Sequence, residues 1–241
     1  MDAASPERLA HYLLKKVNKA CRVYNLLADG DRIAVAVSGG KDSNTLLDLL
    51  HRRQGVERCH LVAVHEAEGE ECRAKVDLTG LERWLQGLGV EYEFVPVEPA
   101  TGQPGRENQS LCFHCAWRRR KALFLAAQRL GCNKVALGHN ADDVAQTTLL
   151  NLVYHGRLGT MAARVEFFGR KITVIRPLYF VPEKEIVRYV QAGGVPVLAD
   201  PCPVAARSRR AEMARVLRVL EQQNPRVKIA LLRAAEKVTG T

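Results

Sequence analysis

The chain has 241 residues, of which 47% are hydrophobic and 26% are charged, and its formal net charge is +10. No stretch approaches the ~20 apolar residues of a membrane-spanning helix, and Met1 to Leu9 lack a signal-peptide core. We therefore exclude a membrane protein and expect a cytoplasmic one. The basic balance favours a polyanionic partner, nucleic acid before a membrane surface. Seven cysteines without a signal peptide favour reduced thiols over a disulfide framework.

Short apolar segments alternate with helical patterns along the chain. The first helix begins at Ser5-Pro6, an N-cap followed by proline, and Asp29-Gly30-Asp31 ends it. The later pattern predicts helices at 44–53, 78–88, 112–130, 141–154 and 182–192, strands at 33–37, 61–64, 91–97, 134–137 and 195–198, and a hairpin over 165–177 that turns at Gly169. Such repeated strand–helix units predict a doubly wound α/β fold with a mostly parallel sheet. From Arg207 onward we expect basic helical structure.

A glycine loop, Ser38-Gly39-Gly40-Lys41-Asp42-Ser43, follows the first predicted strand and opens a helix. Glycines let backbone N–H groups approach a phosphate, and the helix N-terminus adds partial positive charge. Lys41 and the two serine hydroxyls can reach phosphate oxygens, and Asp42 can hold a bridging Mg²⁺ ion. The spacing matches neither the Walker A motif nor the dinucleotide-binding motif. An ordinary βα turn would not need these four polar residues, so we predict a nucleotide-phosphate site.

The motif Ser-Gly-Gly-x-Asp-Ser resembles the signature of the PP-loop ATPases, which cleave ATP between its α- and β-phosphates and adenylate a substrate. A second element of that family, Leu137-Gly138-His139-Asn140-Ala141-Asp142-Asp143, follows another predicted strand. The resemblance implies that Gly138 and His139 lie beside the α-phosphate. It also implies that Asp142 or Asp143 orients the nucleotide or moves a proton, although an acidic pair suits the first turn of any helix.

The same resemblance assigns the adenine to the end of the second strand. The matching stretch is Ala63-Val64-His65, so Val64 and His65 are expected at the base. His65 could stack on the adenine, and an ordinary surface position for this histidine is the alternative.

Three cysteines are candidates for one metal or redox site. Cys112 and Cys115 have the C-x-x-C spacing that lets two sulfur atoms reach one metal or cluster. Cys202 follows a predicted strand end, where the active-site residues of parallel sheets gather. The residues leave three alternatives open: a [4Fe–4S] cluster with one open iron, zinc with His114 or water as fourth ligand, and a redox or persulfide-carrying cysteine pair.

Longer stretches are similar to the TtcA family of tRNA thiolation enzymes. They are Arg22 to Ser43, Leu111 to Cys115 with the arginines that follow, and Ile175 to Leu178 with Glu183 to Ile186. The resemblance implies that Cys112, Cys115 and Cys202 hold a [4Fe–4S] cluster whose open iron carries sulfur. It implies that sulfur replaces the C2 oxygen of a tRNA pyrimidine, an anticodon-loop cytidine.

The resemblance does not decide which tRNA base is thiolated. The run Asp200 to Ala205 around Cys202 differs from the best-known members, and the chain is shorter than they are. The 2-thiouridine synthetases of the TtuA group use three such cysteines as well. They usually carry further zinc-binding cysteine pairs, and this chain has no second C-x-x-C, which favours the TtcA family.

Two basic segments are candidates for RNA contact. The first, Arg118, Arg119, Arg120 and Lys121, follows Cys115, and the resemblance places Arg119 at the active site. The second begins the C-terminal segment with Arg207, Arg209 and Arg210, which suit contacts with the tRNA backbone. The alternatives are solvated arginines on the first segment and membrane contact by the second.

These expectations combine into one hypothesis. An N-terminal helix (1–30) precedes a PP-loop ATP-binding catalytic domain (31–204) and a basic helical extension (205–241). ATP and Mg²⁺ bind the glycine loop, and Lys41 with Mg²⁺ stabilises the charge that develops as the cytidine O2 attacks the α-phosphate. A cysteine desulfurase or sulfide supplies sulfur, no membrane takes part, and a homodimer is left open. The competing functions are an amidase-type ligase, a tRNA-lysidine synthetase, a non-catalytic ATP- or RNA-binding protein and a zinc-only protein.

Overall fold

The computed structural model describes residues 5–53, 55–68, 77–97, 111–198 and 209–239, without the side chains of 67, 68, 111–113, 238 and 239. Within these residues, six strands form one sheet and eight helices surround it. The strands are β1 (Arg32–Ala36), β2 (His60–Glu68), β3 (Glu91–Val97), β4 (Lys134–Ala136), β5 (Arg164–Phe167) and β6 (Ile172–Ile175). The helices are α1 (Pro6–Tyr24), α2 (Lys41–Arg52), α3 (Thr79–Leu88), α4 (Leu111–Arg129), α5 (Ala141–His155), α6 (Glu183–Gln191), α7 (Arg209–Gln223) and α8 (Val227–Thr239).

The sheet is mostly parallel, as predicted. Its order is β3-β2-β1-β4-β6-β5, and β5 is the antiparallel strand, paired with β6. These two strands form the predicted hairpin, with positive φ at Phe168, Gly169 and Arg170 in its turn. The chain builds outward from β1 to β2 and β3, and then returns to add β4 on the other side of β1. The strand order therefore reverses between β1 and β4, and doubly wound sheets bind their ligands at such a reversal.

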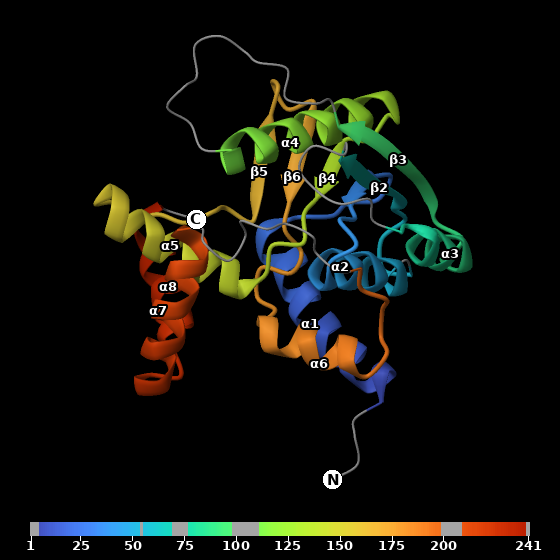
Figure 1. Cartoon of the computed structure of the whole chain (residues 1–241). Coiled ribbons are helices and arrows are strands. Elements are labelled where there is room, and N and C mark those ends of the chain that lie inside the picture. The colour runs from blue at the N-terminus through green and yellow to red at the C-terminus, as the bar shows by residue number, and fades with distance from the viewer. Residues whose placement is uncertain (1–4, 54, 69–76, 98–110, 199–208, 240–241) are drawn as a thin grey trace.

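Helices cover both faces of the sheet (Figure 1). On one face α1, α2, α3 and α6 share an apolar cluster in which Leu46 and Ile186 pack with Ile33. On the other face α4 packs through Leu123 against a cluster that includes Val135. Each fully buried Leu, Ile or Val contributes about 1.5–3 kcal/mol. Because apolar clusters hold it from both faces, the sheet is a rigid support for the loops at its edges.

Local signals explain where α1 begins and ends. Ser5 is the N-cap, its hydroxyl accepts a hydrogen bond from Arg8 N (3.3 Å), and Pro6 is the first helical residue. The helix ends at Asn25, whose φ of 50° is left-handed. The predicted start is therefore confirmed, and the helix ends before the Asp-Gly-Asp sequence that was expected to stop it.

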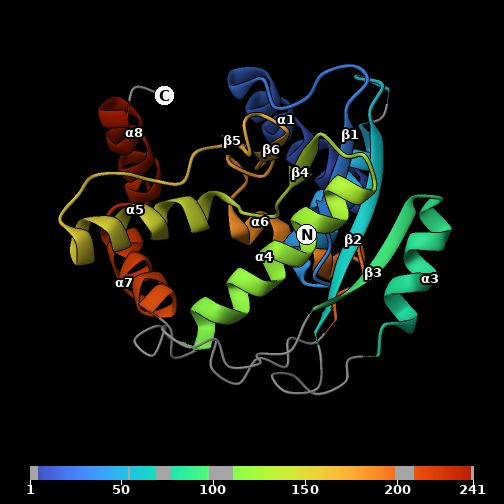
Figure 2. The ribbon, with the colours of Figure 1, turned by 90° about the horizontal axis from the view of Figure 1, so that it is seen from above.

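The two C-terminal helices pack against α5, at one side of the sheet (Figure 2). Ala145 and Leu149 of α5 form a small core with Met213 and Leu217 of α7. The last helix also reaches α1, because the Tyr24 hydroxyl donates a hydrogen bond to Glu236. The division at residues 30 and 204 stays a prediction, and the second boundary lies outside the described residues. Within the described ranges, no helix is long and apolar enough to cross a membrane.

The strand predicted at 195–198 is wrong. These residues have no regular structure, and their link to the body includes a hydrogen bond from Leu198 N to Gly39 O (2.9 Å) and one from Asn44 Nδ2 to Pro196 O (2.8 Å). Pro196 has no N–H group for a ladder. The apolar pattern therefore reflects contact with the glycine loop.

Candidate functional site

Two loops meet at the carboxyl ends of β1 and β4. One leads from β1 to α2 and the other from β4 to α5. Gly138 in the second loop has no room for a side chain, because a Cβ there would lie 3.0 Å from Ser43 N and 3.1 Å from Asp42 C. Its glycine lets the second loop close on the first turn of α2. The two motifs that the sequence pointed to separately are therefore in direct contact.

The glycine loop has the features of a phosphate site. Gly39 has a φ of +82°, which favours glycine. The hydroxyls of Ser38 and Ser43 lie 3.1 Å apart, and Ser43 Oγ accepts a hydrogen bond from Ser38 N (3.1 Å). Gly40 is the N-cap of α2 and has no side chain to accept hydrogen bonds from the first N–H groups of the helix. Those groups and the helix dipole favour an anion at this point.

A closed ring of contacts joins the glycine loop to α5 and α6. Lys41 Nζ lies 2.8 Å from both Asp42 Oδ2 and Glu183 Oε1. Asp42 Oδ1 accepts a hydrogen bond from Asn140 Nδ2 (3.0 Å), and Asn140 Oδ1 accepts one from Asp142 N (2.9 Å). Asp142 Oδ2 accepts one from Glu183 N (2.8 Å), which closes the ring. Burial lowers the pKa of Lys41, but the two carboxylates outweigh burial and raise it above its ordinary value.

The two adjacent aspartates have different surroundings. Asp142 is 7% exposed, and its Oδ1 lies 2.6 Å from Lys228 Nζ in α8. Asp143 Oδ2 accepts a hydrogen bond from Asn140 N (3.0 Å) in a capping box, and its Oδ1 lies 4.0 Å from an Arg210 nitrogen. Burial raises the pKa of Asp143, although Asn140 and Arg210 oppose the rise. Both aspartates lie in the first turn of α5, where an acidic pair is favourable, and Asp143 also takes part in the cap. A role of either aspartate in the chemistry stays a prediction.

Positive charge converges on His139. Arg176 Nε donates a hydrogen bond to His139 Nδ1 (3.2 Å), so the neutral ring carries its hydrogen on Nε2. Burial, followed by the charges of Arg176, Arg210 and Arg120, lowers the pKa of His139 to about 3. His139 is therefore a neutral hydrogen-bond donor at pH 7. The three arginines come from the end of β6, from α7 and from α4, and such convergence suits an anionic ligand.

The strand β2 continues to Glu68, beyond the predicted end at Val64, and its residues level with the end of β1 are more buried than the sequence suggested. Val64 is fully buried, and its carbonyl accepts a hydrogen bond from Val37 N (2.8 Å). His65 Nδ1 donates to Val37 O (2.7 Å), and its ring lies edge-on to Phe94, with centroids 5.6 Å apart. Because His65 is only 9% exposed, the surface alternative for this histidine is wrong.

Arg119 reaches the same edge of the sheet from α4. Its guanidinium lies 3.0 Å from Oε2 of Glu66, which follows His65 in β2 just beyond the level at which β1 ends. Glu66 is 8% exposed, and a buried carboxylate needs a positive partner. The pair therefore fixes Arg119 at the carboxyl edge, and its role in an active site stays a prediction.

The cysteines are described only in part. Cys112 and Cys115 lie three residues apart in the sequence of α4. Cys115 is half-buried and lies one turn before Arg119. Cys202 and the side chain of Cys112 lie outside the described residues, and within those residues no three metal-ligating side chains gather. Two thiolates from one helix turn fit a cluster or zinc that a third ligand completes.

The basic residues predicted to bind RNA lie on α4 and α7. Arg118 and Arg119 are half-buried, whereas Arg120 and Lys121 are exposed. On α7, Arg209 lies over the Tyr154 ring at 4.8 Å, and Arg210 approaches Asp143. Arg207 falls outside the described residues. RNA binding by this set stays a prediction.

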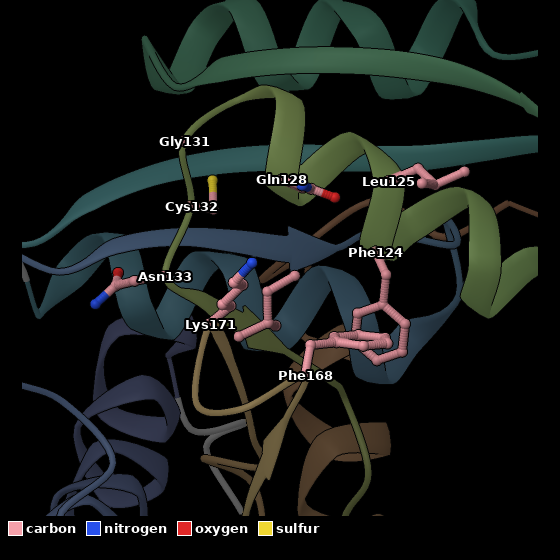
Figure 3. Close-up of a pocket in the computed structure, with 9 residues that line it drawn as sticks. Phe124, Leu125, Gln128, Gly131, Cys132, Asn133, Phe168 and Lys171 are labelled. Carbon is pink, nitrogen blue, oxygen red and sulfur yellow. The ribbon is translucent and has the colours of Figure 1, made fainter.

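A separate cavity of about 530 Å³ lies between α4 and the β5–β6 hairpin (Figure 3). Phe124 and Phe168 line it and pack edge to face, with ring centroids 5.6 Å apart, and Asn133 and Lys171 also line it. Asn133 and Lys171 directly precede β4 and β6. The cavity therefore lies at the amino ends of these strands, opposite to the glycine loop, and is not part of the candidate site.

Several residues of the site carried no assignment from the sequence. Asn140 had a usable signal, because Asn-x-x-Asp before a helix is a capping-box pattern. Glu183 in the first turn of a helix after a proline was a weaker one. Arg176 stands in a stretch that is similar to the TtcA family, but no role was assigned to it. Glu66 and Lys228 had no signal, since each is defined by a partner that is distant in the sequence.

Comparisons with known proteins agree with this geometry. The PP-loop domain family matches residues 9–220. The chain is 40% identical over 230 residues to the tRNA-cytidine(32) 2-sulfurtransferase of Citrifermentans bemidjiense, covering 92% of this chain and 89% of the relative. It is 41% identical over 227 residues to the protein of that name in Geobacter sulfurreducens, covering 92% and 88%. It resembles the solved structure of the U34-tRNA thiolase NcsA from Methanococcus maripaludis with its [4Fe-4S] cluster, with a TM-score of 0.76 and 26% identity over 97% of this chain and 79% of that one.

Proposed function

We propose a function on the premise that this chain belongs to the tRNA-cytidine(32) 2-sulfurtransferases of the PP-loop family. The protein adenylates O2 of a tRNA cytidine with ATP, and sulfur then replaces that oxygen. The observation that carries the proposal is the contact between the glycine loop and residues 138–143 at the reversal between β1 and β4. The helix that bears Cys112 and Cys115 places Arg119 at the same edge.

The triphosphate of ATP binds the first turn of α2. The N–H groups of that turn and the hydroxyls of Ser38 and Ser43 contact the phosphates. Lys41 exchanges its contact with Asp42 for phosphate oxygens and keeps its contact with Glu183, and Asp42, released from Lys41, is the residue that would hold Mg²⁺. Val64 and His65, the residues of β2 level with the end of β1, receive the adenine.

Adenylation forms a bond between the cytidine O2 and the α-phosphorus and breaks the bond to the β-phosphate, which releases pyrophosphate. Charge grows on the phosphate oxygens, and fixed donors aimed at that charge lower the barrier. His139 donates a hydrogen bond from Nε2 to these oxygens, and Arg119 and Lys41 bring positive charge near them. Asp143, with its raised pKa, orients the cytidine and accepts a proton from the N4 amino group of the adenylated base, whereas Asp142 supports the loop through Glu183.

Cys112, Cys115 and Cys202 would hold a [4Fe–4S] cluster, which when bound supplies an iron site for sulfur. As sulfur adds to C2 of the base, the C2–O2 bond breaks and AMP leaves. The sulfur source is sulfide, or persulfide sulfur from a cysteine desulfurase that takes up two electrons from an external thiol reductant before it adds to the base. The exposed side chains of Arg120, Lys121, Arg209 and Arg210, together with Arg118 and Arg207, contact the RNA backbone, which gives salt-dependent affinity.

The test is thiolation by the purified protein. Anaerobically reconstituted protein, ATP, sulfide and a tRNA transcript should yield 2-thiocytidine by nucleoside mass spectrometry, with AMP and pyrophosphate in equal amounts. Cys202→Ala should lose iron and thiolation, whereas Cys59→Ala, at a half-buried cysteine beside Ala28, should keep both. Full iron content and activity in Cys202→Ala would refute the three-cysteine site.

A second candidate is thiolation of a uridine, because the similar solved structure is named a U34-tRNA thiolase. The sequence relatives named for cytidine are closer, at 40% and 41% identity. The same mass spectrometry separates the two candidates, since 2-thiouridine in place of 2-thiocytidine would favour the second. A protein that binds ATP but forms no thionucleoside would refute both.

A further inference from the structure

The last helix, α8, contributes a cation to the edge of the site that residues 138–143 form. Lys228, in the first turn of α8, places its Nζ 2.6 Å from Asp142 Oδ1 and 2.7 Å from Glu221 Oε2 of α7. The PP-loop family matches residues 9–220, so α8 lies beyond the matched region. Neither sequence motif assigned a function to this lysine.

Lys228 is linked to the glycine loop by a short path. It holds one oxygen of Asp142, and the other oxygen accepts the hydrogen bond from Glu183 N. The Glu183 carboxylate in turn contacts Lys41 Nζ at 2.8 Å. A displacement of Asp142 would therefore move the start of α6 and change the partner of Lys41.

The Lys228–Asp142 pair is shielded from solvent. The side chain of Lys228 is 21% exposed and that of Asp142 is 11% exposed. Burial lowers the pKa of Lys228, but the hydrogen bonds to Asp142 and Glu221 outweigh it and raise the pKa. An aspartate this buried that lost its lysine would keep an uncompensated charge, so its carboxylate would turn toward water or take up a proton.

The preceding helix, α7, makes a similar contact with the other aspartate, Asp143. Arg210 of α7 lies 4.0 Å from Asp143 Oδ1. Each of the two C-terminal helices thus brings one cation to one of the two adjacent aspartates.

We propose that Lys228 is a positioning residue for the adenylation step, which it serves by holding Asp142 and, through Glu183, the loop that carries Lys41. This inference rests on the proposed function. It assigns to α8 a part in catalysis in addition to any contact with RNA. The competing explanation is that Lys228 only stabilises the packing of α7 on α5. In that case its contact with Glu221 matters as much as its contact with Asp142.

The experiment measures pyrophosphate release with tRNA as a function of substrate concentration. Lys228→Ala should lower kcat roughly 10- to 100-fold, as the loss of an orienting partner does, with KM for ATP and tRNA unchanged. Lys228→Arg should recover much of the rate, because a guanidinium can still hold the carboxylate. Lys237→Ala, the same change at an exposed position of α8, and Glu221→Gln should keep the wild-type kcat.

A double-mutant cycle separates positioning from folding. If Lys228 acts through Asp142, the loss in kcat from Lys228→Ala should disappear in an Asp142→Asn background. Three outcomes would overturn this inference and leave the proposed function standing. They are a wild-type kcat in Lys228→Ala, a loss that adds in full to the loss from Asp142→Asn, and an equal loss in Glu221→Gln. A wild-type protein that releases no pyrophosphate with tRNA would overturn the proposed function, and this inference with it.

Discussion

Gly138→Ala tests whether the two motifs must touch. A Cβ at this position would lie 3.0 Å from Ser43 N and 3.1 Å from Asp42 C, against 3.4–4 Å for ordinary contact. Both neighbours are backbone atoms, so they cannot swing away, and the loop before α5 must move from α2 by several tenths of an ångström. Overpacking of this kind costs about 1–3 kcal/mol. The displacement also separates His139 from the phosphate site.

Two assays follow that perturbation. Urea unfolding should show the loss of about 1–3 kcal/mol, and pyrophosphate release should fall roughly 10- to 100-fold, because sub-ångström to 1 Å misplacement of reacting groups has effects of that size. Gly159→Ala is the matched control, since its Cβ would meet nothing within 4 Å. Unchanged stability and unchanged activity in Gly138→Ala would refute the reasoning.

Two further predictions concern titration and charge. The pKa of His139 is about 3 in the folded protein, against 6.5 for an ordinary histidine ring. As pH falls, the unfolded chain therefore takes up a proton before the folded protein does. The stability that the neutral ring contributes is fully present above pH 6.5 and is lost as pH falls toward 3. Between pH 7 and pH 5 the free energy of unfolding of the wild type should fall by about 1–2 kcal/mol through this group. In urea unfolding, His139→Gln should lose that much less between the two pH values. The same change with pH in both proteins would contradict the lowered pKa. Glu66→Gln should lower kcat about tenfold by loosening Arg119, whereas Glu93→Gln, which breaks the more exposed pair with Arg129, should not; equal rates in both variants would show that Arg119 needs no anchor.

Local patterns predicted the elements and the edge at which the site forms. Residues 38–43 and 138–143 each follow a buried strand, and parallel strands place their carboxyl ends together, so their meeting could be expected from the sequence. The predicted strand at 195–198 failed because an apolar run also results from packing against the glycine loop. The partners of Asp142 and Arg119 could not be expected, because a pair such as Lys228 with Asp142 leaves no periodic signal. Such pairs depend on how distant helices are placed in three dimensions.

The hydrogen bond between Tyr24 and Glu236 has a consequence for the order of assembly. It joins residues 212 positions apart, and contacts that close so long a loop form late, after the entropy of closure has been offset by local structure. The strand–helix units that build the glycine loop involve much shorter closures. We therefore expect α8 to dock among the last events of folding, so that Asp142 gains its lysine only when the rest of the sheet is already in place.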